Sequence, residues 1–233
     1  MISSNDLMVF YLGLELQSLA LYVLASFKRN DQLSSESGLK YFVLSALSSG
    51  LLLYGCSLIY GFSGSTNFDQ ISNNISEVQY GLTLGIVFIL VGLAFKISAV
   101  PFHMWAPDVY QGSPTSVTIF FAILPKIAAL SVFIRFLYVP FINLIDQWQT
   151  IIIFVSIASM VFGAVAAIGQ KNLKRLMAYS SISHMGFALA GLAVGTNEGI
   201  QSSLIYISIY LLMNLAFFSC LFMLKRNDIY HED

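Results

Sequence analysis

The chain has 233 residues, of which 57% are hydrophobic and only 10% are charged. A soluble domain is about one-quarter charged, so this composition leaves too little polar surface for a water-soluble globule and predicts a protein embedded in lipid. The formal net charge of −1 gives no electrostatic reason to expect nucleic acid as a partner. The sequence has no CxxC motif, no His/Cys cluster and no glycine-rich phosphate loop, so we expect neither a cofactor nor a metal in this chain.

Seven apolar stretches approach or exceed the roughly 20 residues that a helix needs to cross the hydrocarbon core of a bilayer. They predict an all-α, polytopic membrane protein that forms a single membrane domain over residues 1–233. Residues 63–80 are rich in Ser, Asn and Gly and are predicted to form a long loop on the outer side. The predicted spans are Leu7–Phe27, Tyr41–Phe62, Leu82–Val100, Val117–Val139, Ile151–Gly169, Met177–Val194 and Ile200–Leu224.

Basic residues gather at the ends of alternate spans, and positive loops favour the inner side of a membrane. Eight of the eleven lysine and arginine residues fall on one side if the N-terminus lies outside. The C-terminus is therefore predicted to lie inside, and Arg135 to reach the outer interface from the fourth span. The eight residues are Lys28, Arg29, Lys40, Lys171, Lys174, Arg175, Lys225 and Arg226.

Three ionisable residues, Glu15, Lys96 and Lys126, remain deep inside the predicted spans. Insertion scales put the cost of one lysine at the bilayer centre at about 2.5–3.5 kcal/mol. A buried Glu–Lys pair that only fixes helix packing would offset much of the cost of two charges and leave the second lysine unexplained. We favour the alternative interpretation, in which the three residues form part of a proton path.

Prolines follow the first buried lysine closely and predict a broken helix. Pro101 and Pro107 cannot donate the backbone hydrogen bonds that a continuous helix over residues 82–112 would need. Such a helix would be about 45 Å long, which exceeds a straight bilayer crossing. Carbonyls freed at this depth are tolerated only against protein or water, so the break is expected to line a hydrated cavity.

Other residues near these charges have open roles. Pro125 directly precedes Lys126 and would free the carbonyl of Phe121, so disrupted backbone is expected beside both lysines. His103 either relays protons or hydrogen-bonds a carbonyl released at the break. Lys40 is either an anchor at the membrane interface or the entrance to the path.

Two long motifs are similar to those of a known family. Residues 95–115, FKISAVPFHMWAPDVYQGSPT, resemble the signature of the antiporter-like membrane subunits of respiratory complex I. Residues 174–186, KRLMAYSSISHMG, resemble a second signature of the same group. With LGLEL at residues 12–16 and LKYFVLSA at residues 39–46, the sequence is most similar to the subunit 2 group of NADH:ubiquinone oxidoreductase, in its mitochondrial type.

The resemblance implies a fold of two inverted repeats, each with a broken helix. Residues 1–139 would form most of the first repeat, and residues 149–225 the first part of the second. The resemblance also implies that Glu15 is paired with Lys96, and that Lys126 is the next member of a hydrophilic axis along which protons move. Electrons would pass from NADH to quinone in neighbouring subunits, so FMN, iron–sulfur clusters and ubiquinone would belong to the whole complex and not to this chain.

Partners and location follow from the same resemblance. The other membrane subunits of the complex and the lipid bilayer would surround the chain, in the mitochondrial inner membrane or, alternatively, in a bacterial plasma membrane. Family members usually have further helices before and after this segment, so we expect a separate chain or a missing segment to supply them. Two other functions stay open: a subunit of a stand-alone cation/proton antiporter, and a scaffold subunit that no longer pumps.

Overall fold

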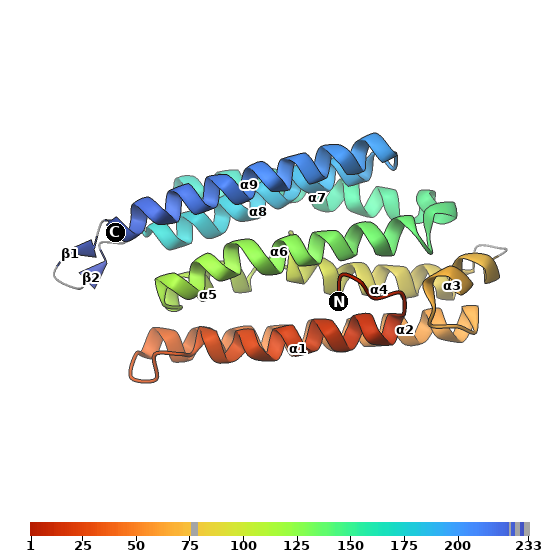
Figure 1. The fold of residues 1–233 in the computed structure, drawn as a ribbon, viewed down its shortest axis with the longest axis horizontal. Helices are drawn as coiled ribbons and strands as arrows, with labels where there is room; N and C mark the ends of the chain where they lie inside the picture. Colours follow the sequence, from red (N-terminus) through yellow and green to blue (C-terminus); the bar gives the residue numbers. More distant parts are fainter. Residues whose placement is uncertain (76–78, 224, 227–228, 231–233) are drawn as a thin grey trace.

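The computed structural model describes residues 1–75, 79–223, 225–226 and 229–230, and its helices pack side by side along one direction (Figure 1). In this described part of the chain, six helices are long and apolar enough to cross a membrane. A seventh apolar helix is shorter, with 17 residues. The prediction of an all-α, polytopic membrane protein with about seven membrane helices is therefore confirmed.

The order of elements places a broken pair of helices between two groups of long ones. A small antiparallel hairpin of two strands follows the last helix. The elements are α1 (Leu7–Ala25), α2 (Gln32–Ser63), α3 (Phe68–Asn74), α4 (Tyr80–Lys96), α5 (Trp105–Gly112), α6 (Thr115–Tyr138), the 3-10 helix η1 (Ile142–Leu144), α7 (Ile145–Ile168), α8 (Leu173–Ala193), α9 (Asn197–Met223), β1 (Lys225–Arg226) and β2 (Ile229–Tyr230).

Side-chain caps place the starts of two helices earlier than the apolar stretches predict. Asp31 accepts a hydrogen bond from a backbone N–H in the first turn of α2, so this helix begins before the expected Tyr41. Asn172 caps α8 in the same way, ahead of the expected Met177. A cap satisfies backbone donors that the helix itself leaves free. α2 and α8 therefore begin before the apolar stretches from which the sequence predicts them.

The basic loops lie together, as the charge pattern predicts. The loop after α1, the start of α8 and the hairpin lie at one end of the bundle, and α3 lies at the other (Figure 1). We call the end that carries the loop after α1 and the start of α8 the basic end. It includes residues 26–31 and 169–172. The predicted outer loop, residues 63–80, contains α3, while its residues 76–78 lie outside the described part. Which end faces the inner side of the membrane stays a prediction.

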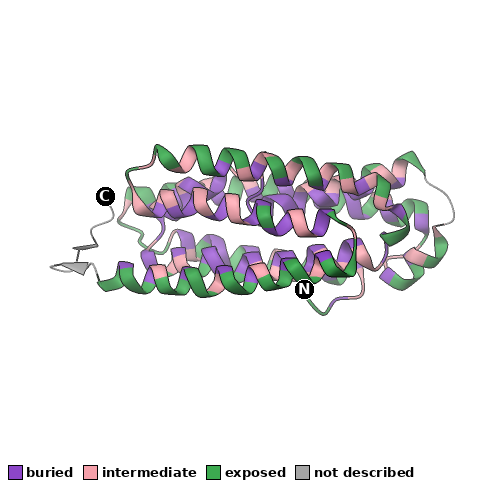
Figure 2. Ribbon diagram, turned by 90° about the horizontal axis from the view of Figure 1, so that it is seen from above, coloured by how far each residue is buried: buried purple, intermediate pink, exposed green. Residues whose placement is uncertain are grey.

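Buried residues follow the inner face of each helix (Figure 2). The outward faces carry many exposed hydrophobic residues. Leu16, Phe154 and Ile209 expose 73%, 69% and 61% of their surface, although all three are hydrophobic. Such surface is unfavourable in water, whereas lipid tails cover it because they are equally apolar. The exposed surface therefore agrees with a bundle that has the bilayer core as its solvent.

The predicted break lies between α4 and α5. The first of these helices ends at Lys96, and the chain forms turns over residues 97–104. Pro101 lies within this segment, as its missing backbone donor predicts. The expectation that Pro107 also breaks the helix is wrong, because Pro107 lies in the first turn of α5, where its N–H would have no helical partner.

Pro125 does not interrupt its helix. α6 runs continuously over Thr115–Tyr138 and includes this proline. The missing donor removes one backbone hydrogen bond to Phe121, and packing against neighbouring helices keeps the helical course. Of the two lysines inside the predicted spans, Lys96 lies beside broken backbone, whereas Lys126 lies on a continuous helix.

The arrangement of the two ends predicts a labelling pattern. In a chain whose native Cys56 and Cys220 are replaced by alanine, a cysteine introduced by Asn73→Cys or by Lys171→Cys is exposed. A membrane-impermeant maleimide should reach these two positions from opposite sides of a sealed vesicle, because α3 and the start of α8 lie at opposite ends. Labelling of both positions from the same side would contradict the arrangement.

Candidate functional site

Lys96 reaches from the end of α4 into a polar cradle formed by α1 and α2. Its Nζ donates hydrogen bonds to Ser18 Oγ at 2.6 Å and to Ser45 Oγ at 2.7 Å. Ser18 in turn donates its own proton to the carbonyl of Leu14 at 2.7 Å, so its oxygen is free to accept. Hydrogen bonds to a charged group contribute about 1.5–3 kcal/mol each. The two hydroxyls therefore offset much of the cost of burying the ammonium group.

Glu15 does not make the direct contact with Lys96 that the resemblance implies. Within the described residues, the two side chains form no ion pair, and Glu15 Oε1 is buried without a hydrogen-bond partner. Their charges still interact at longer range. Ser18 lies one turn after Glu15 on α1, and its hydroxyl contacts the Lys96 ammonium group in place of the Glu15 carboxylate. Lys96 thus rests on hydroxyls with a carboxylate nearby, and the functional pairing stays a prediction.

Lys126 is fully buried in α6 and contacts two other helices. Its Nζ donates to Ser181 Oγ in α8 at 2.6 Å and lies 5.5 Å from the centre of the Tyr110 ring in α5. An aromatic face attracts a cation by about 2 kcal/mol where water is excluded. In the part of the chain that the structure describes, no carboxylate pairs with Lys126. The ammonium group is therefore held by a hydroxyl and an aromatic face.

Aromatic rings connect the surroundings of the two lysines. Trp105 stacks on Tyr41 with ring centroids 4.6 Å apart, and its Nε1 donates to the carbonyl of Phe95 at 2.8 Å. Tyr41 also meets Phe121 edge to face at 5.7 Å. Trp105 belongs to the same short helix as Tyr110, which covers the other lysine. α5 therefore supplies one aromatic residue to the surroundings of each lysine.

His103 lies in the break and packs against Phe162, with ring centroids 4.5 Å apart. Its second predicted role, a hydrogen bond to a carbonyl released at the break, stays a prediction. Its Nδ1 is buried and has no hydrogen-bond partner among the described residues. The structure brings His103 into contact with neither buried lysine in that part of the chain, so its relay role stays a prediction.

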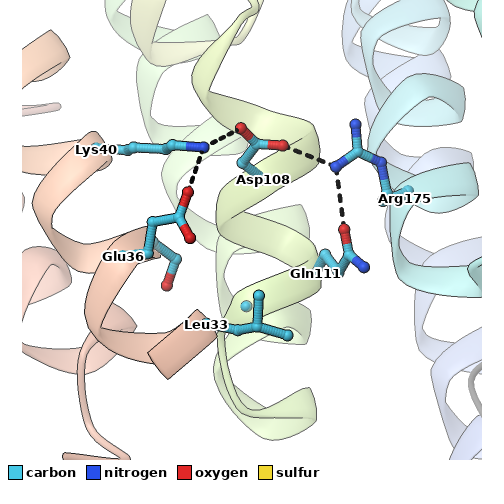
Figure 3. A pocket seen from close by; sticks show the side chains of 8 residues that line it. Leu33, Glu36, Lys40, Asp108, Gln111 and Arg175 are labelled. Carbon is cyan, nitrogen blue, oxygen red and sulfur yellow. Dashed lines mark hydrogen bonds and ion pairs between the residues drawn. The ribbon is translucent and has the colours of Figure 1, made fainter. Parts of the chain in front are cut away.

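Lys40 belongs to a charged cluster at the basic end (Figure 3). Its Nζ lies 2.7 Å from Glu36 Oε1 and 2.8 Å from Asp108 Oδ2. The other oxygen of Asp108, Oδ1, lies 2.7 Å from Arg175 Nη1, which also donates to Gln111 Oε1 at 3.0 Å. These side chains line a cavity of about 180 Å³. The cluster joins α2, α5 and α8.

Asp108 is the centre of this cluster. Burial raises the pKa of Asp108, but hydrogen bonds from Lys40 and Arg175 outweigh burial and hold the pKa below its ordinary value. Because the folded state lowers this pKa, the bonds stabilise the fold above the pKa of the unfolded chain, and the stabilisation is lost as the pH falls through the folded pKa. At neutral pH the carboxylate is ionised and holds both cations.

The groups that receive the lysines were not among the predicted site residues. Ser18, Ser45 and Ser181 lie within apolar runs, where a serine commonly bonds a carbonyl of its own helix. Two signals were available in the sequence. Ser18 follows Glu15 by one helical turn, and Ser181 lies inside the second family motif. Neither signal specifies which lysine the hydroxyl contacts, because that depends on how the helices pack.

Residues 4–231 match the family described as NADH:quinone oxidoreductase/Mrp antiporter, transmembrane. The chain belongs to this family. NADH-quinone oxidoreductase subunit N of Pelagibacter ubique is 80% identical over 232 residues, which are 100% of this chain and 49% of that protein. This chain therefore spans about half the length of the curated relative that it matches.

Similar solved structures confirm the antiporter-like fold. A chain of respiratory complex I from Thermus thermophilus with bound aureothin is 36% identical, with a TM-score of 0.80 over 94% of this chain and 47% of that chain. A chain of the Mrp complex from Dietzia sp. DQ12-45-1b has a TM-score of 0.86 over 95% of this chain and 42% of that chain. Its identity is 24%, so this likeness shows the fold alone. These similar proteins are bacterial, and the expected mitochondrial type is not confirmed.

The cradle of Lys96 predicts a coupled loss of stability. Ser45→Ala should lower the free energy of unfolding by about 1.5–3 kcal/mol, because a buried ammonium group loses an acceptor. The same substitution in a Lys96→Met chain should cost much less, since no charge is then left unsatisfied. Denaturant titration in detergent measures both values. Ser208→Ala is the matched control because Ser208 is exposed and bonds within its own helix; equal costs with and without Lys96 would contradict the cradle.

Proposed function

We propose that this chain carries part of a transmembrane proton path in the membrane arm of a proton-pumping NADH:quinone oxidoreductase, respiratory complex I. Electron transfer in other subunits drives the path, and this chain contributes no redox site. The observation that supports the proposal most strongly is that Lys96 and Lys126, the two lysines inside the predicted spans, both rest on serine hydroxyls. An amine held in this way can give up its proton without breaking an ion pair.

The path in this proposal includes Glu15, Lys96 and Lys126. Lys96 sits at the break with Glu15 as the nearby carboxylate, and Lys126 lies on the next long helix. Charged groups at membrane depth mark ion paths because their insertion is costly. The relay roles of His103 and Lys40 stay predictions. Lys40 contributes to the ion pairs at the basic end in either case.

The partners in this proposal are the other membrane subunits of the complex. The curated relative is about twice as long as this chain, and we propose that the helices of its remaining part pack against this bundle, in the same polypeptide or in a separate one. The assignment of residues 1–139 to most of the first inverted repeat, and of residues 149–225 to the first part of the second, belongs to the same proposal. FMN, iron–sulfur clusters and ubiquinone are assigned to the other subunits. The bacterial relatives favour a bacterial plasma membrane over the mitochondrial inner membrane.

A stand-alone cation/proton antiporter is the second candidate function. The likeness to a chain of an Mrp complex favours it, because the antiporter-like fold is common to both kinds of assembly. Co-purification of the native chain with NADH-oxidising subunits separates the two functions. The third alternative, a scaffold that no longer pumps, leaves the cost of burying Lys126 without a functional reason.

Lys126 gives the sharpest test of the proton path. In the assembled complex, Lys126→Met should preserve assembly and lower NADH-driven proton translocation by roughly tenfold or more, because a positioned proton-transfer group is lost. Lys126→Arg should also impair translocation, since a guanidinium group does not release its proton at accessible pH. Lys126→His should retain part of the activity, because imidazole titrates near neutral pH. Quinone reduction and vesicle acidification are measured together.

Lys171→Met is the matched control for this series. Lys171 is an exposed lysine in the loop before α8, at the basic end, so its loss should leave both rates unchanged. Normal rates in both Lys126→Met and Lys126→Arg would remove Lys126 from the path and favour the scaffold role.

A further inference from the structure

α5 depends on its neighbours for its position. It has only eight residues, and the broken segment precedes it. Isolated helices shorter than about 12–15 residues are marginal even with favourable sequences. Tertiary contacts must therefore fix this helix, and they come from its aromatic residues and from the charged cluster.

The charged contacts of α5 converge on Asp108. Its Oδ2 accepts from Lys40 of α2 at 2.8 Å, and its Oδ1 accepts from Arg175 of α8 at 2.7 Å (Figure 3). A single carboxylate thus binds two helices with separate oxygens. Gln111, one turn later on α5, adds a second contact to Arg175 at 3.0 Å. Glu36 contributes less to α5, because it pairs with Lys40 on its own helix.

The same short helix carries one contact toward Lys96 and one toward Lys126. Trp105, one turn before Asp108, donates through Nε1 to the carbonyl of Phe95, the residue before Lys96. Tyr110, two residues after Asp108, places its ring 5.5 Å from the Nζ of the other lysine. A shift of α5 would therefore change the surroundings of both lysines together.

We propose that Asp108 is a positioning residue: by binding Lys40 and Arg175 at once, it fixes α5 between α2 and α8 and so sets the surroundings of both Lys96 and Lys126. The functional part of this inference rests on the proposed proton path. The anchoring cluster lies at the basic end beside a cavity of about 180 Å³, and Asp108 has 35% of its side chain exposed. The ion pairs of Asp108 thus lie at the basic end, apart from the Lys96 and Lys126 amines whose surroundings they set.

Trp105 provides a direct readout of the position of α5. The chain has two tryptophans, so Trp148→Phe leaves Trp105 as the sole reporter in the full chain, reconstituted in lipid nanodiscs. In this background, Asp108→Asn should shift the emission maximum of Trp105 to longer wavelength and increase its quenching by acrylamide, because the indole loses its fixed stacking and hydrogen bond. Asp108→Glu keeps the charge and should restore most of the parent spectrum.

Glu36→Gln is the matched control for the spectrum, because it makes the same chemical change in the same cluster without touching Asp108. It should leave Trp105 unaltered. A parent-like spectrum for Asp108→Asn, or an equal shift for Glu36→Gln, would overturn the proposal. Circular dichroism and elution volume establish that each variant is folded. If Asp108→Asn does not fold, Arg175→Gln removes one of the two ion pairs and should give a smaller shift of the same sign; an unshifted spectrum would overturn the proposal.

The functional arm uses the assembled complex. Asp108→Asn should lower NADH-driven proton translocation several-fold, whereas Asp69→Asn, the same change on exposed α3 at the opposite end, should not. Lys126→Met in the same preparation separates two kinds of failure. Normal translocation by Lys126→Met contradicts the proton path itself. Impaired Lys126→Met together with normal Asp108→Asn retains the proton path and overturns the positioning role.

Discussion

The ammonium groups of Lys96 and Lys126 are buried within the predicted spans of a chain that has the bilayer core as its solvent, and the packing of the helices depends on how those two groups are satisfied. An ammonium group in this setting costs several kcal/mol unless it finds partners. Lys96 finds them on α1 and α2, and Lys126 finds its hydroxyl on α8. Each contact joins helices that are distant in sequence. The polar contacts therefore determine which faces turn inward, since apolar faces alone distinguish poorly between lipid and another helix.

The break and the first buried charge support each other. Lys96 is the last residue of α4, and the carbonyl ends of a helix carry partial negative charge that favours a cation. Ending the helix there also frees carbonyls, and Trp105 satisfies that of Phe95. The Pro101 segment thus does more than shorten a long helix. It places a cationic side chain at a helix C-terminus, deep in the bundle, where two serines from other helices complete its coordination.

The sequence predicts well those features that depend on one helix at a time. Composition and apolar length predict the membrane class and the number of spans, and Pro101 predicts the break. Features that depend on neighbours are predicted poorly: Pro125 lies within a continuous helix because packing decides whether a missing donor matters. Glu15 shows the same limit: its functional pairing with Lys96 stays a prediction, and only the packed helices reveal the hydroxyl contacts of Lys96. Asp108 lies in the longest family motif, yet its two cations come from helices far away in sequence.

The side chains that lie between Lys96 and Lys126 favour coupling of the two lysine sites through α5 over proton transfer along a continuous chain of hydrogen bonds. The described groups that link their surroundings are aromatic: Tyr41 stacks on Trp105, and Tyr110 faces Lys126. Indole does not exchange a proton near neutral pH, and a phenol ordinarily titrates near pH 10. Proton transfer along this line therefore requires water or movement of a side chain. α5 contacts both lysine sites. One displacement of this short helix would therefore move side chains at both sites together.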